Sequence, residues 1–413
     1  MSVITIFSGA YCQEEPLVRK VLSDTGYKLV ADADIVALAG KTSNMAARKI
    51  EKAFSAKTSA FNNFTHEKER SIAHLRLALA EILAGDNLLI AGFTGQLIPK
   101  EIRHVLRVCL IADMRFRTAQ AAGQDGLSEK EALKVIHKSD NDRVQWVNTL
   151  SGNQDPWDSA LYDIVIPMDK MSVEDGEALI IENLGKDVVN PTAGSKKAVE
   201  DFLLAAMVEV ALAGEGHDVG VSARQGAVTL IINKHVLMLG RLEEELKSIV
   251  GQVPGVNSVE TKVGTGFYQA DVYRKYDFEM PSKVLLVDDE REFVQTLSER
   301  LLLRDMGSTV AFDGESALDL IDEDEPEVMI LDLRMPGIDG IEVLKRVKQT
   351  HPEIEVIILT GHGSEADREQ CMELGAFAYL QKPQNIDDLS DVLKKANEKM
   401  RLNLAAKNKS DQG

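Results

Sequence analysis

The stretch "KVLLVDD" (283–289) is a run of four apolar residues between a lysine and two aspartates. A short apolar run with polar ends is typical of a strand that is buried on both faces. Similar runs follow at "VMILDL" (328–333), "VIILT" (356–360) and "AYLQK" (378–382), with helical patterns between them. This alternation predicts a doubly wound parallel α/β sheet of about 120 residues, the size of one domain.

Polar residues stand where these predicted strands end. Asp288 and Asp289 end the first strand, Asp332 the second and Thr360 the third, and Lys382 follows the fourth. Because ligands bind at the carboxyl ends of parallel strands, the five side chains should converge. Three carboxylates in one pocket repel one another unless a cation neutralises them, and oxygen ligands suit Mg²⁺ or Mn²⁺.

Such a site could accept a phosphoryl group. With the metal bound, Asp332 can attack phosphorus as a carboxylate nucleophile, while Lys382 and Thr360 hold the remaining phosphate oxygens. Any one of these residues alone would more often belong to a solvated surface loop. Their occurrence together, in order and at successive strand ends, favours the site.

Residues 283–397 resemble a response-regulator receiver domain, through "LLVDDE", "MILDLRMPGIDG", "ILTGHG" and "LQKP". The resemblance implies a flavodoxin-like (βα)5 fold. It also implies that Asp332 is the phospho-acceptor and that a sensor histidine kinase or a phosphotransfer protein is the donor. Asp288 and Asp289 would be the acidic metal pair, and the backbone carbonyl of Arg334 the third protein ligand.

The same resemblance implies a switch pair, Thr360 and Tyr379. When Thr360 turns toward the phosphoryl group, Tyr379 can rotate into the vacated space. That movement would repack the face formed by the fourth helix, fifth strand and fifth helix of the domain. Without the motif, Tyr379 would be interpreted as a core aromatic residue.

The bulk properties limit the classes of partner. The 413 residues predict two or three domains, and a net charge of −19 disfavours nucleic acid and anionic lipid while favouring metal cations. Cys12, Cys109 and Cys371 are scattered and lack a CxxC spacing, which indicates a reducing cytoplasm. No signal-peptide pattern opens the chain, and "FLLAAMVEVALA" (202–213) is too short to span a bilayer.

Residues 1–190 show a second α/β pattern. The predicted strands are "VITIF", "NLLIAGF" (87–93), "VLRVCLI" (105–111) and "LYDIVIPMD" (161–169). A charged helical region, 127–148, has a capping-box spacing. The segment resembles the cytidylate-kinase-like family of P-loop nucleotide kinases. In that family "KSDNDR" (138–143) would form a lid that includes Lys138, and Arg143 would be the lid arginine that meets phosphate.

The phosphate loop itself is degenerate. Gly9 is present, but the family's glycine-rich turn is replaced by Tyr11, Cys12, Gln13 and Glu14, and no Lys-Ser or Lys-Thr pair follows. Glutamates suit a helix start but repel a triphosphate. For Arg143 and the arginines at 103, 107, 115 and 117, a solvated face is slightly favoured over a working phosphate clamp. We therefore expect the domain to be inactive as a kinase and not to bind ATP tightly.

Residues 196–270 form a small α+β unit that resembles a BON domain, through "HDVGVSARQGAVTLIIN" (217–233) and "IVGQVPGVNSVETKV" (249–263). We interpret it as an interaction or spacer module, with membrane or lipid contact less favoured. His217 is expected to be a surface or turn histidine rather than a ligand. Linkers are expected at 190–198 and 273–282. The receiver should occupy 282–400, and a disordered tail 401–413.

The sequence thus predicts a cytoplasmic bacterial response regulator whose phosphorylated receiver signals to the preceding modules or to an unknown output protein. No helix-turn-helix pattern follows the receiver, so direct nucleic-acid binding is not expected. The alternative is a nucleoside monophosphate kinase that the receiver regulates.

Overall fold

The computed structural model describes residues 2–410 except 44, 237, 269–279, 305, 362 and 383. The chain forms two compact units. One comprises Met1–Thr58 and Glu67–Tyr273, and the other comprises Ser59–His66 and Arg274–Gly413. Because residues 269–279 are not described, most of the linker predicted at 273–282 lies outside the described residues.

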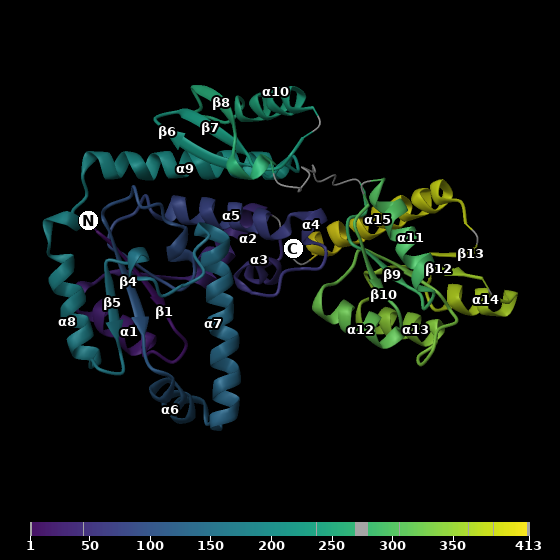
Figure 1. The fold of residues 1–413 in the computed structure, drawn as a ribbon, viewed down its shortest axis with the longest axis horizontal. Helices are drawn as coiled ribbons and strands as arrows, with labels where there is room; N and C mark the ends of the chain where they lie inside the picture. The colour runs from purple at the N-terminus through teal and green to yellow at the C-terminus, as the bar shows by residue number, and fades with distance from the viewer. Residues whose placement is uncertain are drawn as a thin grey trace. The chain divides into compact units, whose positions relative to one another are not determined.

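The first unit contains a parallel five-stranded sheet in the order β2-β3-β1-β4-β5 (Figure 1). The strands are β1 Val3–Ser8, β2 Lys28–Ala31, β3 Leu88–Ala91, β4 Val105–Ile111 and β5 Ile164–Pro167. The helices are α1 Glu14–Thr25, α2 Asp32–Ser43, α3 Ala47–Glu51, α5 Glu67–Ile82, α6 Met114–Asp125, α7 Glu129–Ser151 and α8 Val173–Leu184. The capping box at Ser128 and Glu131 is confirmed at the start of α7.

Both faces of this sheet are covered, as expected for parallel strands. Alternate residues of β1 point to opposite faces, so that Val3 and Phe7 pack with α2, α5 and α7, while Ile4 and Ile6 pack with α1 and α8. All six residues of β1 are buried. The sequence did not predict β2, a half-exposed edge strand that lacks a continuous apolar run.

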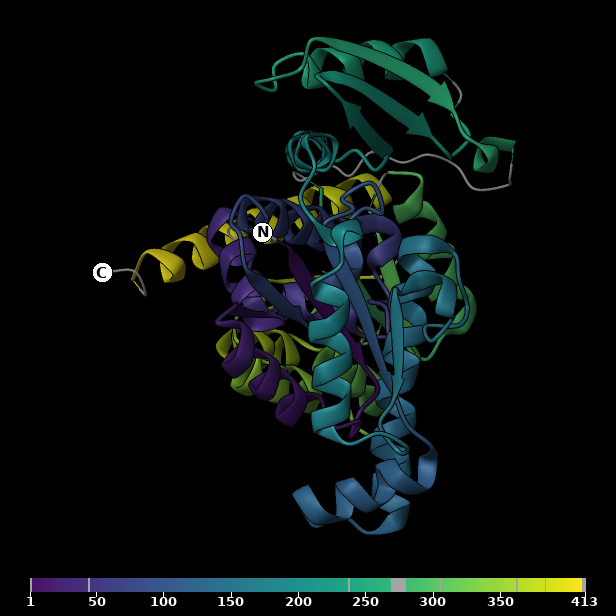
Figure 2. The ribbon, with the colours of Figure 1, turned by 90° about the vertical axis from the view of Figure 1, so that its left-hand side faces the viewer.

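A long helix, α9 (Ala193–Gly214), lies between α5 and a second sheet in the same unit (Figure 2). That sheet has the order β6-β7-β8, with β6 Gly220–Arg224, β7 Ala227–Ile232 and β8 Ser258–Val263, and α10 spans Leu239–Val250. The linker prediction at 190–198 was wrong from Ala193 onward, because Thr192 caps a helix there through the Ser195 N–H.

His217 directly follows the turn at residues 215–216, but a surface position for it was wrong. The residue is 4% exposed, and its Nε2 lies 3.4 Å from a carboxylate oxygen of Glu245 on α10. The turn expected near Gln225 and Gly226 is confirmed, since both residues have positive φ angles between β6 and β7.

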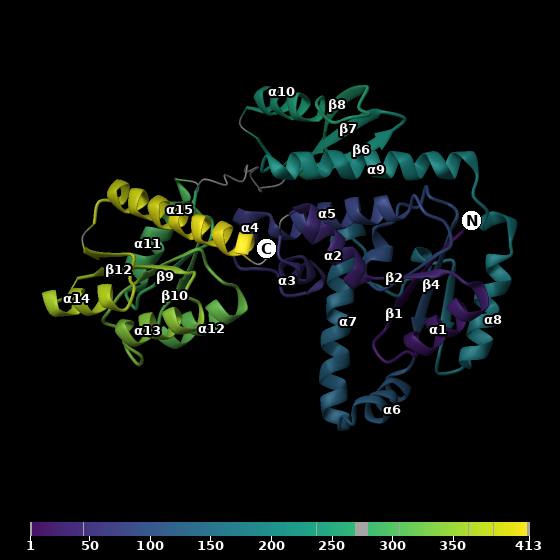
Figure 3. The same ribbon diagram turned by 180° about the vertical axis from the view of Figure 1, so that it is seen from behind.

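The second unit contains a parallel sheet in the order β10-β9-β11-β12-β13 (Figure 3). The strands are β9 Val284–Val287, β10 Ser308–Ala311, β11 Val328–Leu331, β12 Glu355–Thr360 and β13 Ala378–Gln381. The helices are α11 Arg291–Leu302, α12 Gly314–Glu323, α13 Gly340–Thr350, α14 Glu365–Glu373 and α15 Ile386–Ser410. Helices α12 and α13 pack on one face, and α11 and α15 on the other.

Two features of this unit differ from the prediction. Strand β10 was missed because, like β2, it is a partly exposed edge strand. The prediction of a disordered tail was wrong for residues 401–410, because α15 continues to Ser410. Among the described residues, no helix is both long and apolar enough to cross a bilayer.

The eight residues Ser59–His66, which include α4 (Asn62–Thr65), belong to the second unit. Ser59 Oγ donates a hydrogen bond to Asp324, which also pairs with Lys283 at 3.3 Å. A Cβ on Gly307 would overlap the Phe64 side chain, so this glycine gives the segment room to pack before β10. The chain thus leaves the first unit after Thr58 and returns to it at Glu67.

Candidate functional site

The register of the second sheet brings the predicted residues to one edge. Val287 on β9 is level with Leu331 on β11, so the next residues, Asp288 and Asp332, lie side by side. The Asp332 N–H donates to the carbonyl of Val287 at 2.9 Å. Strands β9 and β11 flank the point where the strand order reverses, which is where open α/β sheets bind ligands.

Three carboxylates gather there. Each of Asp288, Asp289 and Asp332 offers an oxygen, and these oxygens all lie within 4.8 Å of one another. Asp288 and Asp332 are each 5% exposed, and Asp289 is exposed. Oδ1 of Asp332 is buried and has no hydrogen-bond partner among the described residues. A buried, unpartnered carboxylate oxygen costs free energy, and a divalent cation would satisfy it. The donor set therefore fits Mg²⁺ or Mn²⁺.

Lys382 lies against this cluster. Its backbone N–H donates to the Thr360 carbonyl, and its Nζ donates to Asp288 at 2.5 Å and to Glu290 at 3.0 Å. Burial opposes the charge, but the hydrogen bonds to Asp288 and Glu290 raise the pKa of Lys382. Burial also raises the pKa of Asp288, although the bond from Lys382 counteracts it. The sequence analysis did not select Glu290 as a site residue. Its position directly after the paired aspartates was a signal that could have identified it.

Thr360 and Tyr379 lie on adjacent strands. Thr360 is 1% exposed at the end of β12, and the hydroxyl of Tyr379 is buried without a hydrogen-bond partner among the described residues. A Cβ placed on Gly363 would overlap that hydroxyl and lie 3.1 Å from the Thr360 methyl. The three residues therefore share one small space, and sequence reasoning missed Gly363.

The exposed side of the cluster opens into a cavity of about 550 Å³. Asp289, Arg334 and Asp367 line it. Arg334 follows Asp332 by two residues at the same sheet edge. The role of its backbone carbonyl as a metal ligand, which the family resemblance implies, stays a prediction.

The degenerate phosphate loop of the first unit follows β1. Tyr11 and Gln13 have φ angles of 62° and 55°, so side chains occupy conformations that glycine adopts more readily. Gln13 precedes α1 without a side-chain cap, and Glu14 and Glu15 occupy the first turn of that helix, as the sequence predicts.

Two arginines hold this loop through its carbonyl oxygens. Arg117 Nε donates to Ala10 at 2.8 Å, and its two terminal nitrogens form a bidentate pair with Asp140 at 2.9 and 2.7 Å. Arg143 Nε donates to the Ser8 carbonyl at 2.5 Å. The sequence analysis slightly favoured a solvated face for these arginines. That prediction is wrong for Arg117, which is 6% exposed.

The surroundings of the loop carry more negative than positive charge. Burial raises the pKa of Glu14, and the nearby Arg143 partly offsets this effect. Asp32 accepts hydrogen bonds from the backbone N–H groups of Phe93 and Thr94 at 2.8 and 2.9 Å. Three carboxylates (Asp32, Asp140 and Glu14) thus face two guanidinium groups. Lys138, the other predicted lid residue, is exposed.

The fold and the strand-end carboxylates of the second unit define a flavodoxin-like α/β domain with an acidic, cation-fitting site. The model of the response regulator receiver domain matches residues 284–394, and that of the cytidylate kinase-like family matches residues 3–170. Sporulation initiation phosphotransferase F of Bacillus subtilis (strain 168) is 37% identical over 116 residues, which are 28% of this chain and 94% of that protein. The chain therefore belongs to the response regulator receiver family through its C-terminal domain.

A second relative matches over a stretch of similar length. The transcriptional regulatory protein CpxR of Escherichia coli (strain K12) is 48% identical over 108 residues, which are 26% of this chain and 46% of that protein. The chain thus spans about half the length of the CpxR proteins that it matches. A solved receiver domain from Clostridium thermocellum is 33% identical, with a TM-score of 0.28, over 29% of this chain and 97% of that one.

Proposed function

We propose that the chain is a response regulator of a bacterial two-component system that accepts a phosphoryl group on Asp332. The observation that carries the proposal is the buried, unpartnered Oδ1 of Asp332 beside Asp288 and Asp289 at the reversal of strand order. The donor would be a sensor histidine kinase or a phosphotransfer protein.

The step forms a bond between a carboxylate oxygen of Asp332 and phosphorus. The bond from phosphorus to the donor breaks, and its electron pair leaves with the donor, which is acetate when acetyl phosphate is used. Asp288, Asp289, Asp332 and the carbonyl of Arg334 would hold Mg²⁺, which supplies positive charge against the phosphoryl oxygens. Lys382 would exchange its bond to Asp288 for a phosphoryl oxygen, and Thr360 would donate its hydroxyl to another.

Phosphorylation would then act through Thr360 and Tyr379. Once the Thr360 hydroxyl turns toward the phosphoryl group, the phenol of Tyr379 fills the space beside it, and the α14–β13–α15 face changes its contacts. The output would be the preceding domains or a separate protein in the cytoplasm, without direct nucleic-acid binding.

Incubation with acetyl phosphate and Mg²⁺, followed by intact-protein mass spectrometry, tests the proposal. The wild-type chain should gain one phosphoryl group, and Asp332→Asn should gain none. The control is Asp319→Asn, which makes the same chemical change at an exposed position on α12 and should be phosphorylated normally. A phosphorylated Asp332→Asn protein would contradict the assignment.

The family match of residues 3–170 keeps one alternative open, a nucleoside monophosphate kinase regulated by the receiver. The loop geometry disfavours it, because Arg117 and Arg143 are bound to loop carbonyls and the surroundings are acidic. Calorimetry with ATP and Mg²⁺ should detect no micromolar binding to the full chain. Binding in that range would favour the kinase instead.

A further inference from the structure

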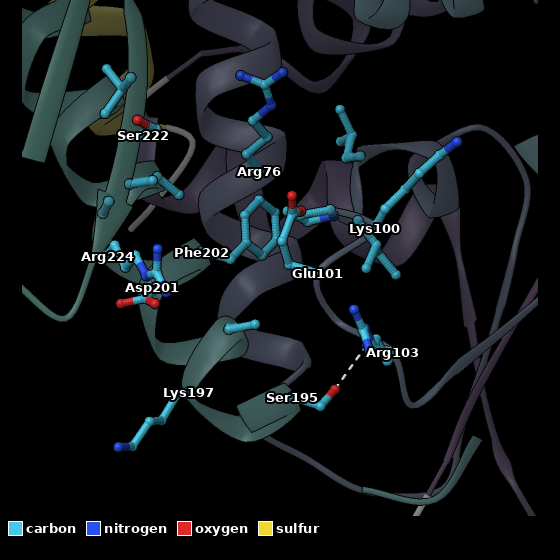
Figure 4. A pocket seen from close by; sticks show the side chains of 18 of the residues that line it. Arg76, Lys100, Glu101, Arg103, Ser195, Lys197, Asp201, Phe202, Ser222 and Arg224 are labelled. Atoms are coloured by element: carbon cyan, nitrogen blue, oxygen red, sulfur yellow. Dashed lines mark hydrogen bonds between the residues drawn. The ribbon is translucent and has the colours of Figure 1, made fainter. Parts of the chain in front are cut away.

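Strand β8 forms an exposed edge of the second sheet in the first unit. It pairs with β7 on one side, and no strand among the described residues pairs with its other side. The opposite edge strand, β6, packs against α9, and both help to line a cavity of about 1100 Å³ (Figure 4). The residues of β8 are more exposed than those of β6. An exposed edge is a surface on which a further strand can pair.

The backbone bonds to β7 determine which residues of β8 present polar groups outward. The N–H groups of Ser258 and of Gly264, which follows β8, donate to carbonyls just before β7 and at its end, at 3.4 and 2.9 Å. Because backbone groups alternate in direction along a strand, the even-numbered residues of β8 face β7. The odd-numbered residues, which are Val259, Thr261 and Val263, therefore direct their N–H and C=O groups away from the sheet.

The side chains of this edge are complementary to those of a second copy. When two β8 strands lie antiparallel about a two-fold axis at Thr261, Glu260 of each copy is opposite Lys262 of the other. These pairs have no backbone bonds between them, so their side chains approach most closely. Val259 of each copy is opposite Val263 of the other, and Val263 is 41% exposed in one chain. The edge thus matches itself in backbone bonds, charge and apolar contact.

Charged residues on an edge strand can also prevent pairing. They do so where like charges would meet, but Glu260 and Lys262 are opposite in sign and symmetric about Thr261. Within one chain they pair at 3.2 Å, and in a dimer the four side chains would form a ring of alternating charge. Strand β6 cannot match itself in this way, because "GVSAR" (220–224) contains a basic residue and no acidic one.

We propose that the chain forms a symmetric dimer through antiparallel pairing of β8 with β8 of a second copy, with Thr261 at the two-fold axis. The reciprocal backbone bonds come from Val259, Thr261 and Val263. The contact is short, so the dimer is weak and depends on protein concentration. It does not require phosphorylation, since β8 belongs to the first unit and not to the receiver.

Sedimentation velocity of the full, unphosphorylated chain tests the proposal. The wild type should pass from monomer to dimer as its concentration rises through the micromolar range. Glu260→Lys would place lysines opposite each other and should weaken dimerisation tenfold or more, and Lys262→Glu should do the same with glutamates. The double variant Glu260→Lys/Lys262→Glu restores opposite charges and should dimerise as the wild type does.

An equimolar mixture of the two single variants should form a heterodimer, because the lysines of one meet the glutamates of the other. The matched control is Glu182→Lys, which makes the same charge change in an exposed pair with Lys186 on α8 and should dimerise normally. A wild-type chain that stays monomeric at millimolar concentration would overturn the proposal. So would a dimer that both single variants leave intact, or a double variant that is as weak as the single ones.

Discussion

Gly363 is the residue at which the proposed switch is most sensitive to a single methyl group. Its missing side chain leaves room for the buried hydroxyl of Tyr379, beside Thr360. An added Cβ would force the phenol out of that space or shift the loop after β12. Overpacking of this kind costs about 1–3 kcal/mol.

Gly363→Ala is therefore expected to destabilise the receiver by about 1–3 kcal/mol. Hydrogen exchange of the β9 and β11 amides would measure this, because the strands form the centre of that sheet. On a Tyr379→Ala background the same substitution should have almost no effect, since the clashing hydroxyl is gone. An undiminished effect on that background would show that Tyr379 is not the partner.

One carboxylate links the end of β2 to the turn that follows β3. Asp32, at the start of α2, accepts the backbone N–H groups of Phe93 and Thr94 and the hydroxyl of Thr94. Its carboxylate fills the position that a side chain on Gly92 would take, and Gly92 has a φ of 114°. The edge strand β2 is thus tied to the turn after β3.

Asp32→Ala should lower the free energy of unfolding of the first unit by about 1–3 kcal/mol, because buried backbone donors lose their acceptor. Both tryptophans, Trp146 and Trp157, lie in this unit, so fluorescence during urea unfolding reports on it alone. Asp34→Ala is the control. It removes an exposed carboxylate with a single backbone bond, to Ala31, and its effect should be much smaller.

The stability of the first unit should depend on alkaline pH through one buried thiol. Burial raises the pKa of the Cys12 thiol to about 11, although Arg117 counteracts it, and Cys12 is 1% exposed. A folded pKa above the unfolded value means that the unfolded state loses its proton first. The contribution of the Cys12 thiol to the free energy of unfolding is therefore fully present below the pKa of this thiol in the unfolded state. It is lost as the pH rises toward 11.

Cys12→Ala is expected to reduce the fall in stability between pH 9 and 11 by up to ~1.4 kcal/mol per pH unit. The measurement is tryptophan fluorescence during urea unfolding at several pH values. The receiver, followed by hydrogen exchange, should show no difference between wild type and variant because Cys12 belongs to the first unit. If the free energy of unfolding of the first unit falls equally with pH in the wild type and in the variant, the prediction is contradicted.

Central strands could be predicted from the sequence, and edge strands could not. Strands such as β1, β9 and β11 are buried on both faces, so their apolar runs are continuous and unmistakable. The edge strands β2 and β10 are partly exposed and carry polar residues that also suit loops. The start of α9 was missed because Gly194 and Ser195 resemble a linker until Thr192 is seen to cap a helix.

The order of residues along the chain was sufficient to place Asp288, Asp332, Thr360 and Lys382 at one sheet edge, because parallel strands deliver their carboxyl ends to the same side. Side-chain partners depended on the folded chain. The pairing of Lys382 with Asp288, the unpartnered oxygen of Asp332 and the space beside Gly363 all arise between strands distant in sequence. Distances between side chains are set by packing, and the spacing of residues along a strand does not encode them.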